Sequence, residues 1–240
     1  MLKEKSKSNI YVDSKYQWNV FVGCEFECVY CEPSFQKQMK RQKPVIDKNG
    51  KKRGCQYCYE YIPHFHEERL NNRLPRTYMD EFIWVASSGD ISFCDSEDMN
   101  KILSKVREYP NRTFFFQTKN PKYFQQFEFP ENLILGITLE SDRDWCSITK
   151  APAPDIRYKD FLKVKHPRKI VTIEPILDFD GFILSWIKDI APERVYVGFD
   201  TKNCNLPEPS KEKTLRLITT LTWFTRVRVK YIKYDIVGYK

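Results

Sequence analysis

Three cysteines, Cys24, Cys28 and Cys31, stand close together near the start of this 240-residue chain. Their spacing is C-x3-C-x2-C, and they directly follow an apolar run at residues 18–22 that we expect to be a strand. Cysteine thiolates hold iron–sulfur clusters, and a [4Fe–4S] cube usually takes four of them. Three cysteines on one short loop can hold three irons and leave the fourth open to another ligand. The same residues would also fit a zinc knuckle or three unrelated buried thiols.

A second pattern of metal-ligand residues follows further along the chain. Cys55 and Cys58 form a C-x2-C pair, and His64 and His66 come shortly after it. These are the ligand types of a structural zinc site, although H-x-H is tighter than the spacing of about three to five residues in zinc fingers. We predict a bound metal here, with zinc first. An auxiliary iron–sulfur cluster, reserve ligands for the first cysteines, or buried thiols beside backbone-bonded histidines would also fit.

The composition is that of one globular domain spanning residues 1–240. Hydrophobic residues make up 41% of the chain and charged residues 30%, and no apolar run approaches the roughly 18 residues of a membrane span. Residues 1–7 are polar and lack the apolar core of a signal peptide. Eight cysteines without a secretory signal favour reduced, metal-binding thiols. We therefore expect a cytoplasmic protein without membrane contact.

The net charge of +8 is concentrated in one stretch. Residues 36–53 contain eight Lys or Arg and one Asp, a net of +7, which leaves about +1 for the rest of the chain. The stretch belongs to an insert at about residues 32–75, which also contains the second metal pattern. A basic loop beside a cofactor site suits a polyanion, with nucleic acid first. A solvated surface loop would have the same composition.

From residue 80 onward, apolar runs typical of strands alternate with helical patterns. The predicted strands lie at residues 82–86, 112–117, 132–139, 169–173, 194–198 and 226–232. The predicted helices lie at residues 99–106, 155–165, 183–190 and 209–223. This alternation implies βαβ units and a parallel sheet. Six units suit an α/β fold with an incomplete (β/α)6 barrel better than a closed eight-fold barrel, which typically needs about 250 residues.

Polar residues stand where these strands end. They are Ser87, Ser88, Gly89, Asp90, Lys119, Thr138, Glu140, Glu174 and Asp200. In parallel barrels the sites gather at the carboxyl ends of the strands. Burial of such residues without a ligand would be costly. We therefore expect them to face one mouth, together with the cysteine loop.

The pattern C-x3-C-x-aromatic-C, with Tyr30 as its aromatic residue, resembles that of the radical S-adenosylmethionine (SAM) superfamily. Over residues 18–232 the chain resembles an uncharacterised radical-SAM-like family of phages, bacteria and archaea, related to spore photoproduct lyases. The segments that carry this resemblance are Trp18-Asn19, Gly23-Cys24, Ser87 to Asp90, Gln117 to Pro121, Leu135 to Glu140, Ser147 to Pro154, Ile173 to Pro175 and Val197 to Asp200. Many members have an aromatic residue and an alanine after the third cysteine. This chain has Glu32-Pro33 there, which indicates a subgroup whose substrate differs.

The resemblance implies a [4Fe–4S] cluster on Cys24, Cys28 and Cys31, whose open iron binds SAM. An electron from the cluster would cleave SAM to a 5′-deoxyadenosyl radical, so an electron donor such as flavodoxin or ferredoxin is expected. By position, the loop of residues 87–90 would hold the SAM amino group. Cys94, just past the second strand, would return a hydrogen atom to a substrate radical, by analogy with the lyases.

The resemblance also assigns the other strand-end residues to the cofactor or the substrate. The residues expected to meet the SAM carboxylate and ribose are Lys119, Thr138, Glu140 and Arg143. Glu174 and Asp200 would face SAM or substrate.

We therefore expect a radical SAM enzyme that abstracts hydrogen from a substrate, with nucleic acid as the first candidate because the positive charge lies near the mouth. A peptide-modifying radical SAM enzyme is one alternative. A zinc-stabilised nucleic-acid-binding module without catalysis is another, and a brown colour after anaerobic purification would separate it from the enzymes.

Overall fold

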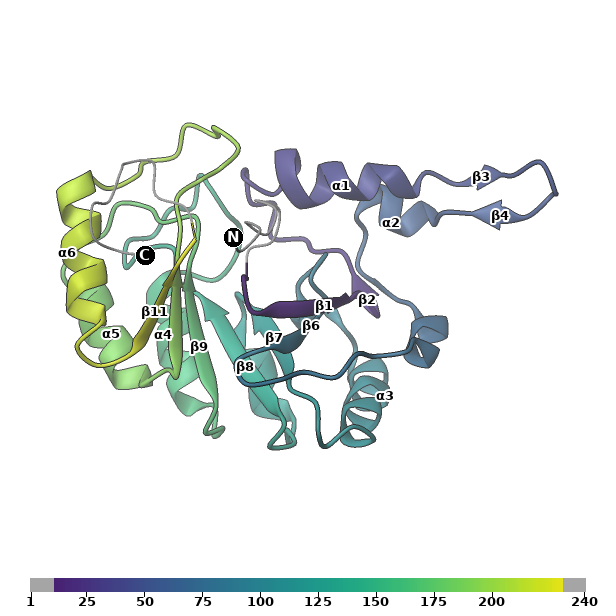
Figure 1. Ribbon diagram of the computed structural model, residues 1–240. Helices are drawn as coiled ribbons and strands as arrows, with labels where there is room; N and C mark the ends of the chain where they lie inside the picture. Colours follow the sequence, from purple (N-terminus) through teal and green to yellow (C-terminus); the bar gives the residue numbers. More distant parts are fainter. Residues whose placement is uncertain (1–10, 231–240) are drawn as a thin grey trace, which may run out of the picture.

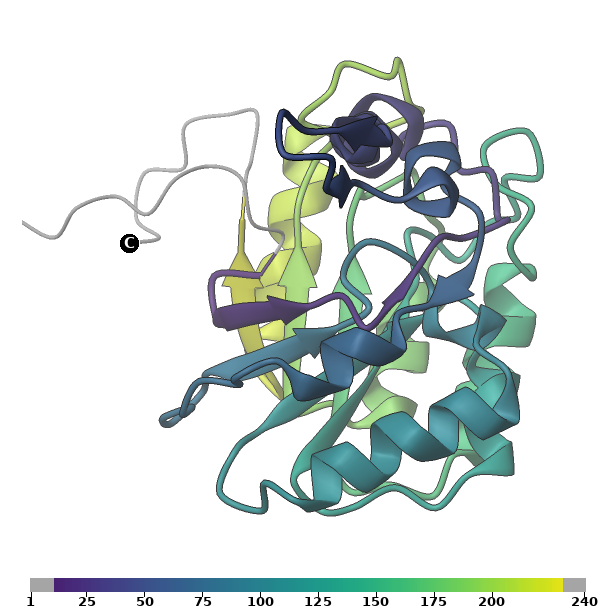
Figure 2. The same ribbon diagram turned by 90° about the vertical axis from the view of Figure 1, so that its right-hand side faces the viewer.

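The computed structural model describes residues 11–230 and is built around one sheet of seven parallel strands in the order β1-β6-β7-β8-β9-β10-β11 (Figure 1). The strands are β1 (Ser14–Trp18), β6 (Phe82–Val85), β7 (Phe114–Thr118), β8 (Leu133–Thr138), β9 (Lys169–Ile173), β10 (Arg194–Val197) and β11 (Arg226–Val229). The sheet curls into a half-barrel, so that β1 and β6 run across the direction of β9 to β11 (Figure 2). The predicted α/β fold and incomplete barrel are confirmed. Residues 231 and 232 of the last predicted strand lie outside the described residues.

Four helices connect β6 to β7, β8 to β9, β9 to β10 and β10 to β11 and cover the outer face of the sheet, whereas a 3-10 helix, η5 (Pro121–Gln126), connects β7 to β8 (Figure 1). The four helices are α3 (Ser96–Arg107), α4 (Pro154–Lys163), α5 (Phe182–Ile190) and α6 (Lys211–Leu221). In α3, buried side chains recur with helical spacing from Met99 to Val106 and face the sheet. Asp95 caps its first turn by accepting a 2.8 Å hydrogen bond from the Asp98 amide.

Aromatic side chains fill the interior of the half-barrel toward the amino-terminal ends of its strands. Tyr11 enters from the N-terminal side, and its ring centroid lies 4.7 Å from those of both Trp84 and Tyr196. Its hydroxyl lies 2.8 Å from Thr172 Oγ1. Because this packing closes the half-barrel at the amino-terminal ends of the strands, the space left inside the sheet lies toward their carboxyl ends.

The first strand differs from the prediction. The sheet strand β1 ends at Trp18, and β2 (Phe21–Val22) pairs instead with the short antiparallel strand β5 (His64–Phe65). The prediction of one strand at residues 18–22 is therefore wrong. The run is apolar because its residues are buried by two different partners, the main sheet and the small one, and an apolar run does not show which partner buries it.

The basic stretch forms an extension of the fold. Its first part is a continuous helical segment, residues 32–42, made of η1 (Glu32–Gln36), α1 (Lys37–Met39) and η2 (Lys40–Gln42). A hairpin of β3 (Val45–Ile46) and β4 (Lys52–Arg53) then projects from the body of the molecule (Figure 1). The chain returns through α2 (Gln56–Glu60) to β5. Within residues 11–230, no helix is long and apolar enough to cross a bilayer.

Candidate functional site

The cysteine loop leaves β2 and is tied to the loop that follows β6. The Gly23 amide donates to the Ser88 carbonyl at 3.1 Å, and the Asp90 amide donates to the Gly23 carbonyl at 3.1 Å. A Cβ on Gly89 would lie 2.5 Å from the Gly23 carbonyl oxygen, and a Cβ on Gly23 would lie 2.4 Å from the carbonyl carbon of Ile62. Gly23 also has φ +99°. Both positions therefore require glycine, which lets three backbone segments meet beside Cys24.

Cationic and polar groups surround the buried thiol of Cys28. Its Sγ lies 3.0 Å from Lys119 Nζ and 3.1 Å from Thr149 Oγ1. Hydrogen bonding with Cys31 lowers the pKa of Cys28, and the Lys119 ammonium lowers it further against the effect of burial. Burial raises the pKa of Cys24. Cys28 is thus the thiol that the protein itself stabilises as a thiolate.

A buried ion network holds Lys119 in this position. Its Nζ lies 2.8 Å from Glu140 Oε1, while Arg157 Nη1 lies 2.7 Å from Glu140 Oε2. The Tyr30 hydroxyl contacts both Glu140 and Lys119. Burial alone would raise the pKa of Glu140, but Arg157 and Lys119 together lower it. Glu140 is therefore an ionised carboxylate whose partners come from the chain itself.

The carboxyl ends of the strands, the cysteine loop and the helical segment enclose a cavity of about 450 Å³. The predicted site residues that line it are Cys24, Cys28, Cys31, Ser87, Ser88, Gly89, Asp90, Lys119, Thr138, Glu174 and Asp200. Residues that sequence reasoning did not assign to the site also line the cavity, among them Gln17, Tyr30, Phe35, Arg41, Tyr61, Trp84, Gln117, Phe199, Lys202 and Lys230. The structure thus brings the first cysteine pattern and most strand-end residues to one cavity.

Two strand-end carboxylates are already bonded to the chain, Asp90 to the end of the neighbouring strand β7 and Asp200 within its own loop. Asp90 accepts from the Lys119 amide at 2.9 Å and from Thr118 Oγ1 at 2.6 Å. Asp200 accepts from the amides of Lys202 at 2.8 Å and Cys204 at 2.5 Å. These carboxylates shape the loops around the cavity, because each fixes backbone that follows a strand.

Glu174 and Lys230 form an ion pair on the cavity wall. Glu174 Oε1 lies 2.6 Å from Lys230 Nζ, and within the described residues the buried Oε2 has no hydrogen-bond partner. Burial raises the pKa of Glu174. On the same inner face, Gln117 Nε2 donates to Thr138 Oγ1 at 2.6 Å.

Besides Glu140, which lies in the buried ion network with Lys119 and Arg157, two predicted residues lie away from the cavity lining. Arg143 forms ion pairs with Asp178 and with Asp180, the second at 2.6 Å. Cys94 is 3% exposed within the core between the sheet and its outer helices, and burial raises the pKa of its thiol. The roles predicted for these two residues remain predictions.

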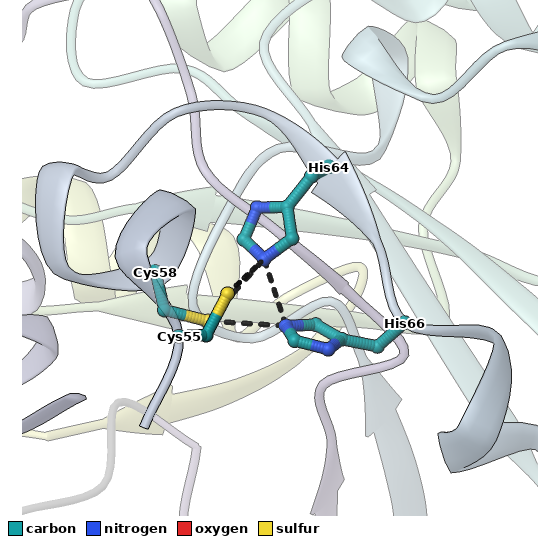
Figure 3. A group of neighbouring side chains, drawn as sticks. All are labelled: Cys55, Cys58, His64 and His66. Atoms are coloured by element: carbon teal, nitrogen blue, oxygen red, sulfur yellow. Dashed lines mark hydrogen bonds between the residues drawn. The ribbon is translucent and has the colours of Figure 1, made fainter. Parts of the chain in front are cut away.

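The second metal pattern comes together as one cluster (Figure 3). One ligand atom from each of Cys55, Cys58, His64 and His66 lies within 4.8 Å of all the others. Cys58 Sγ lies 3.4 Å from His64 Nε2 and 3.1 Å from His66 Nε2, and Cys55 Sγ lies 3.4 Å from His64 Nε2. All four ligands follow the hairpin of β3 and β4 in the chain. Cys55 and Cys58 lie at the start of α2 and within it, and His64 and His66 lie in β5 and directly after it.

The outer nitrogens of the two histidines fix the direction of their rings. His64 Nδ1 lies 2.7 Å from the Ile62 carbonyl, and His66 Nδ1 lies 2.8 Å from Glu68 Oε1. Both partners are acceptors, so each Nδ1 carries the proton. Burial lowers the pKa of both histidines, so both Nε2 atoms present lone pairs, 2.8 Å apart. A cation among two such nitrogens and two sulfurs would turn this repulsion into coordination, with the outer-shell partners usual for zinc.

Sequence reasoning missed several residues around the cavity for identifiable reasons. Tyr30 was visible as the aromatic residue of the cysteine motif, but its contact with Glu140 was not. Arg157 gave no signal, because one arginine on a polar helix is usually solvated. Lys230 follows a basic strand and faces Glu174, 56 positions earlier in the chain.

No family model and no curated protein matches the chain. Solved structures of spore photoproduct lyase share its fold. A cysteine-to-serine variant aligns with a TM-score of 0.58 and 13% identity, over 96% of this chain and 80% of that chain. The lyase complexed with dinucleoside spore photoproduct aligns with a TM-score of 0.57 and 13% identity, over 93% of this chain and 78% of that chain.

Proposed function

We propose that this protein is a radical SAM enzyme of the radical-SAM-like family related to spore photoproduct lyases. The observation that carries the proposal is the position of Cys24, Cys28 and Cys31 on one loop at the cavity of a half-barrel. Three thiols suit three irons of a [4Fe–4S] cluster. The donor set fits the group, because all three thiols of the loop line one cavity and the described loop offers no fourth cysteine.

Cluster and SAM would supply a carbon radical that abstracts a hydrogen atom from the substrate. The chain's own residues bind and orient. Ser88 and Gly89 present backbone next to the cysteine loop, where the SAM amino group is expected. Lys119 supplies a positive charge beside Cys28 for the SAM carboxylate, and Thr138 supplies a hydroxyl on the same wall. Glu174 and Asp200 border the space left for SAM or substrate.

The enclosure of the cavity would protect a reactive intermediate from water. Tyr11 and Trp84 close the inner end, Phe35 from the extension packs against Trp84, and Tyr61 lines the cavity from the extension. The protein's contribution is therefore positioning and exclusion of solvent, while the cofactor carries the chemistry.

Nucleic acid is the proposed substrate class. The basic stretch of residues 36–53 begins in the helical segment that borders the cavity, and Arg41 lines that cavity. Two of the similar lyase structures are complexes with dinucleoside spore photoproduct, a ligand made of nucleosides, and this supports nucleic acid as the substrate class. A flavodoxin or ferredoxin would deliver the electron in the cytoplasm.

We also propose a structural zinc ion at Cys55, Cys58, His64 and His66. Four protein ligands leave zinc no open coordination position, so its role would be to join α2 to β5, the strand that pairs with β2. A Cys55→Ser/Cys58→Ser variant should lose about one zinc per chain, whereas a variant of all three cluster cysteines should keep it. Cys146→Ser, which changes an exposed cysteine, is the control. Full zinc content in the double variant would contradict the assignment.

The function is tested by anaerobic reconstitution with iron and sulfide, followed by SAM and dithionite. We expect 5′-deoxyadenosine from the wild-type protein and from Cys146→Ala, and none from Cys28→Ala. A wild-type protein that holds the cluster but releases no 5′-deoxyadenosine, with or without an oligonucleotide or a peptide mixture, would refute the proposal. A protein that binds zinc and nucleic acid but no iron would be the non-catalytic binding module instead.

A further inference from the structure

The helical segment at residues 32–42 forms a wall between two hollows. Ser34, Gln38 and Arg41 line the cavity described above. Lys37 and Lys40 line a separate groove of about 670 Å³. Positions three and four apart share one face of a helix, so the segment turns a different basic face to each hollow.

The far wall of the groove is the loop that follows β10. Lys202, Asn203 and Cys204 line the groove from this loop, and Lys202 also lines the cavity. The loop is held by its hydrogen bonds to Asp200, so Lys202 occupies a defined place between the hollows. A ligand that extends along the groove can therefore reach the cavity past Lys202.

The groove gathers positive charge that the described chain does not neutralise. Lys37, Lys40 and Lys202 are exposed, and no ion pair joins any of them to a carboxylate within residues 11–230. Glu32 is the acidic residue that lines the groove. Lys40 also lies over the ring of Tyr59, with Nζ 4.7 Å from the ring centroid, which orients its side chain. Three ammonium groups around one groove repel each other and favour a bound polyanion.

Aromatic side chains lie at the end of this charged path. Phe35, half-buried on the helical segment, lines the cavity, and the almost fully buried rings of Trp84 and Phe199 form part of its wall. Proteins that bind single-stranded nucleic acid combine a positive groove for the backbone with aromatic rings on which bases stack. The groove and the cavity offer these two elements in sequence.

We infer that the groove is the track for the backbone of a single-stranded nucleic acid, with phosphates at Lys37, Lys40 and Lys202 and one base entering the cavity. The inference rests on the proposed nucleic-acid substrate and narrows it to a single strand or an extruded nucleotide. It also divides the basic stretch. The lysines of the groove bind the strand, whereas those of the projecting hairpin face solvent away from both hollows.

Two charge-matched variants separate these parts. Lys37→Gln/Lys40→Gln/Lys202→Gln removes three charges from the groove. The control Lys48→Gln/Lys51→Gln/Lys52→Gln removes three charges from the hairpin, where all three lysines are exposed and outside both hollows. Binding of a fluorescein-labelled oligothymidylate, longer than a typical site of roughly 4–16 nucleotides, is measured by anisotropy over a range of salt concentrations.

Each phosphate contact on a single strand contributes a slope of about −0.7 to log K against log[salt]. Loss of three contacts should make the slope shallower by about 2. Between 1 M and 0.1 M salt, the groove variant should therefore gain about 100-fold less affinity than the wild-type protein gains. The hairpin variant should change the slope by less than about 1, and a duplex of the same length should bind the wild-type protein less tightly than the single strand.

Several results would overturn the inference. It fails if the hairpin variant loses as much affinity as the groove variant, if the duplex binds more tightly, or if the wild-type protein binds no oligonucleotide. A wild-type protein that forms 5′-deoxyadenosine without binding any oligonucleotide refutes the groove and leaves the radical SAM proposal standing. Zinc content and thermal unfolding, measured on both triple variants, show that each is folded.

Discussion

Removal of Arg157 should expose how strongly the site depends on its buried ion network. Arg157 is 2% exposed and gives Nη1 hydrogen bonds of 2.7 Å to both Glu140 Oε2 and the Thr138 carbonyl. Arg157→Met keeps the length of the side chain and removes its charge. Breaking a buried pair by removing one partner costs about 3–5 kcal/mol. We expect about 3 kcal/mol, the lower end, because Lys119 still pairs with Glu140.

Urea unfolding under anaerobic, reducing conditions measures this free energy, and thermal unfolding should show a decrease of about 6–12 °C. Lys159→Met is the matched control, because Lys159 lies on the same helix and pairs with Asp155 at 2.8 Å with both side chains exposed. Surface pairs contribute little, so the control should lose less than about 0.5 kcal/mol.

The pH dependence gives an independent check. The pKa of Glu140 in the folded protein lies below its ordinary value, so the pairing contributes fully above the unfolded pKa of about 4.3 and is lost as pH falls toward the folded pKa. The difference between wild type and Arg157→Met should therefore be constant near neutral pH. Below about pH 4.3 it should shrink by up to about 1.4 kcal/mol per unit. A difference no larger than that of the control, or one that persists unchanged to about pH 3, would refute the reasoning.

Two further variants address the cysteine loop. Gly23→Ala would place a Cβ 2.4 Å from the Ile62 carbonyl carbon, so its iron content after reconstitution should fall well below that of wild type. The control Gly181→Ala has no atom within 4 Å of the added Cβ and should retain the wild-type iron content. Equal iron content in the two variants would contradict the packing argument. Lys119→Met removes the hydrogen-bond donor that lies 3.0 Å from Cys28 Sγ. Because hydrogen bonds to the sulfurs tune the reduction potential of a cluster, a redox titration followed by EPR should give a more negative cluster potential than in wild type. An unchanged cluster potential would contradict this.

The sheet and its outer helices could be predicted because their signals are local. Alternating apolar runs and the Met99 to Val106 stripe depend on neighbours within a few residues, and the packing follows those patterns. The first strand was misplaced because Phe21 and Val22 are buried by β5, a partner that periodicity does not identify. Tyr11 was missed for a similar reason, since it fills the half-barrel through contacts such as that with Thr172, 161 positions away.

The two cysteine patterns could be predicted because each is a short linear motif. The network around them could not, since it depends on which distant side chains the fold brings together. Glu140 was expected at the cofactor, yet its partners are Arg157, Lys119 and Tyr30, and each comes from a different element. Lys202 stands in a loop with no motif, and its importance becomes visible only where the groove meets the cavity.

The most direct test of the central claim is the EPR spectrum of the anaerobically reconstituted, dithionite-reduced protein, recorded before and after addition of SAM. A cluster held by Cys24, Cys28 and Cys31 alone has one iron without a cysteine ligand, so SAM should bind there and change the spectrum of the reduced [4Fe–4S] cluster. Cys28→Ala should show neither the signal nor the change, whereas Cys146→Ala should show both. A reduced cluster whose spectrum SAM leaves unaltered, or a Cys28→Ala protein with the full wild-type signal, would contradict the account.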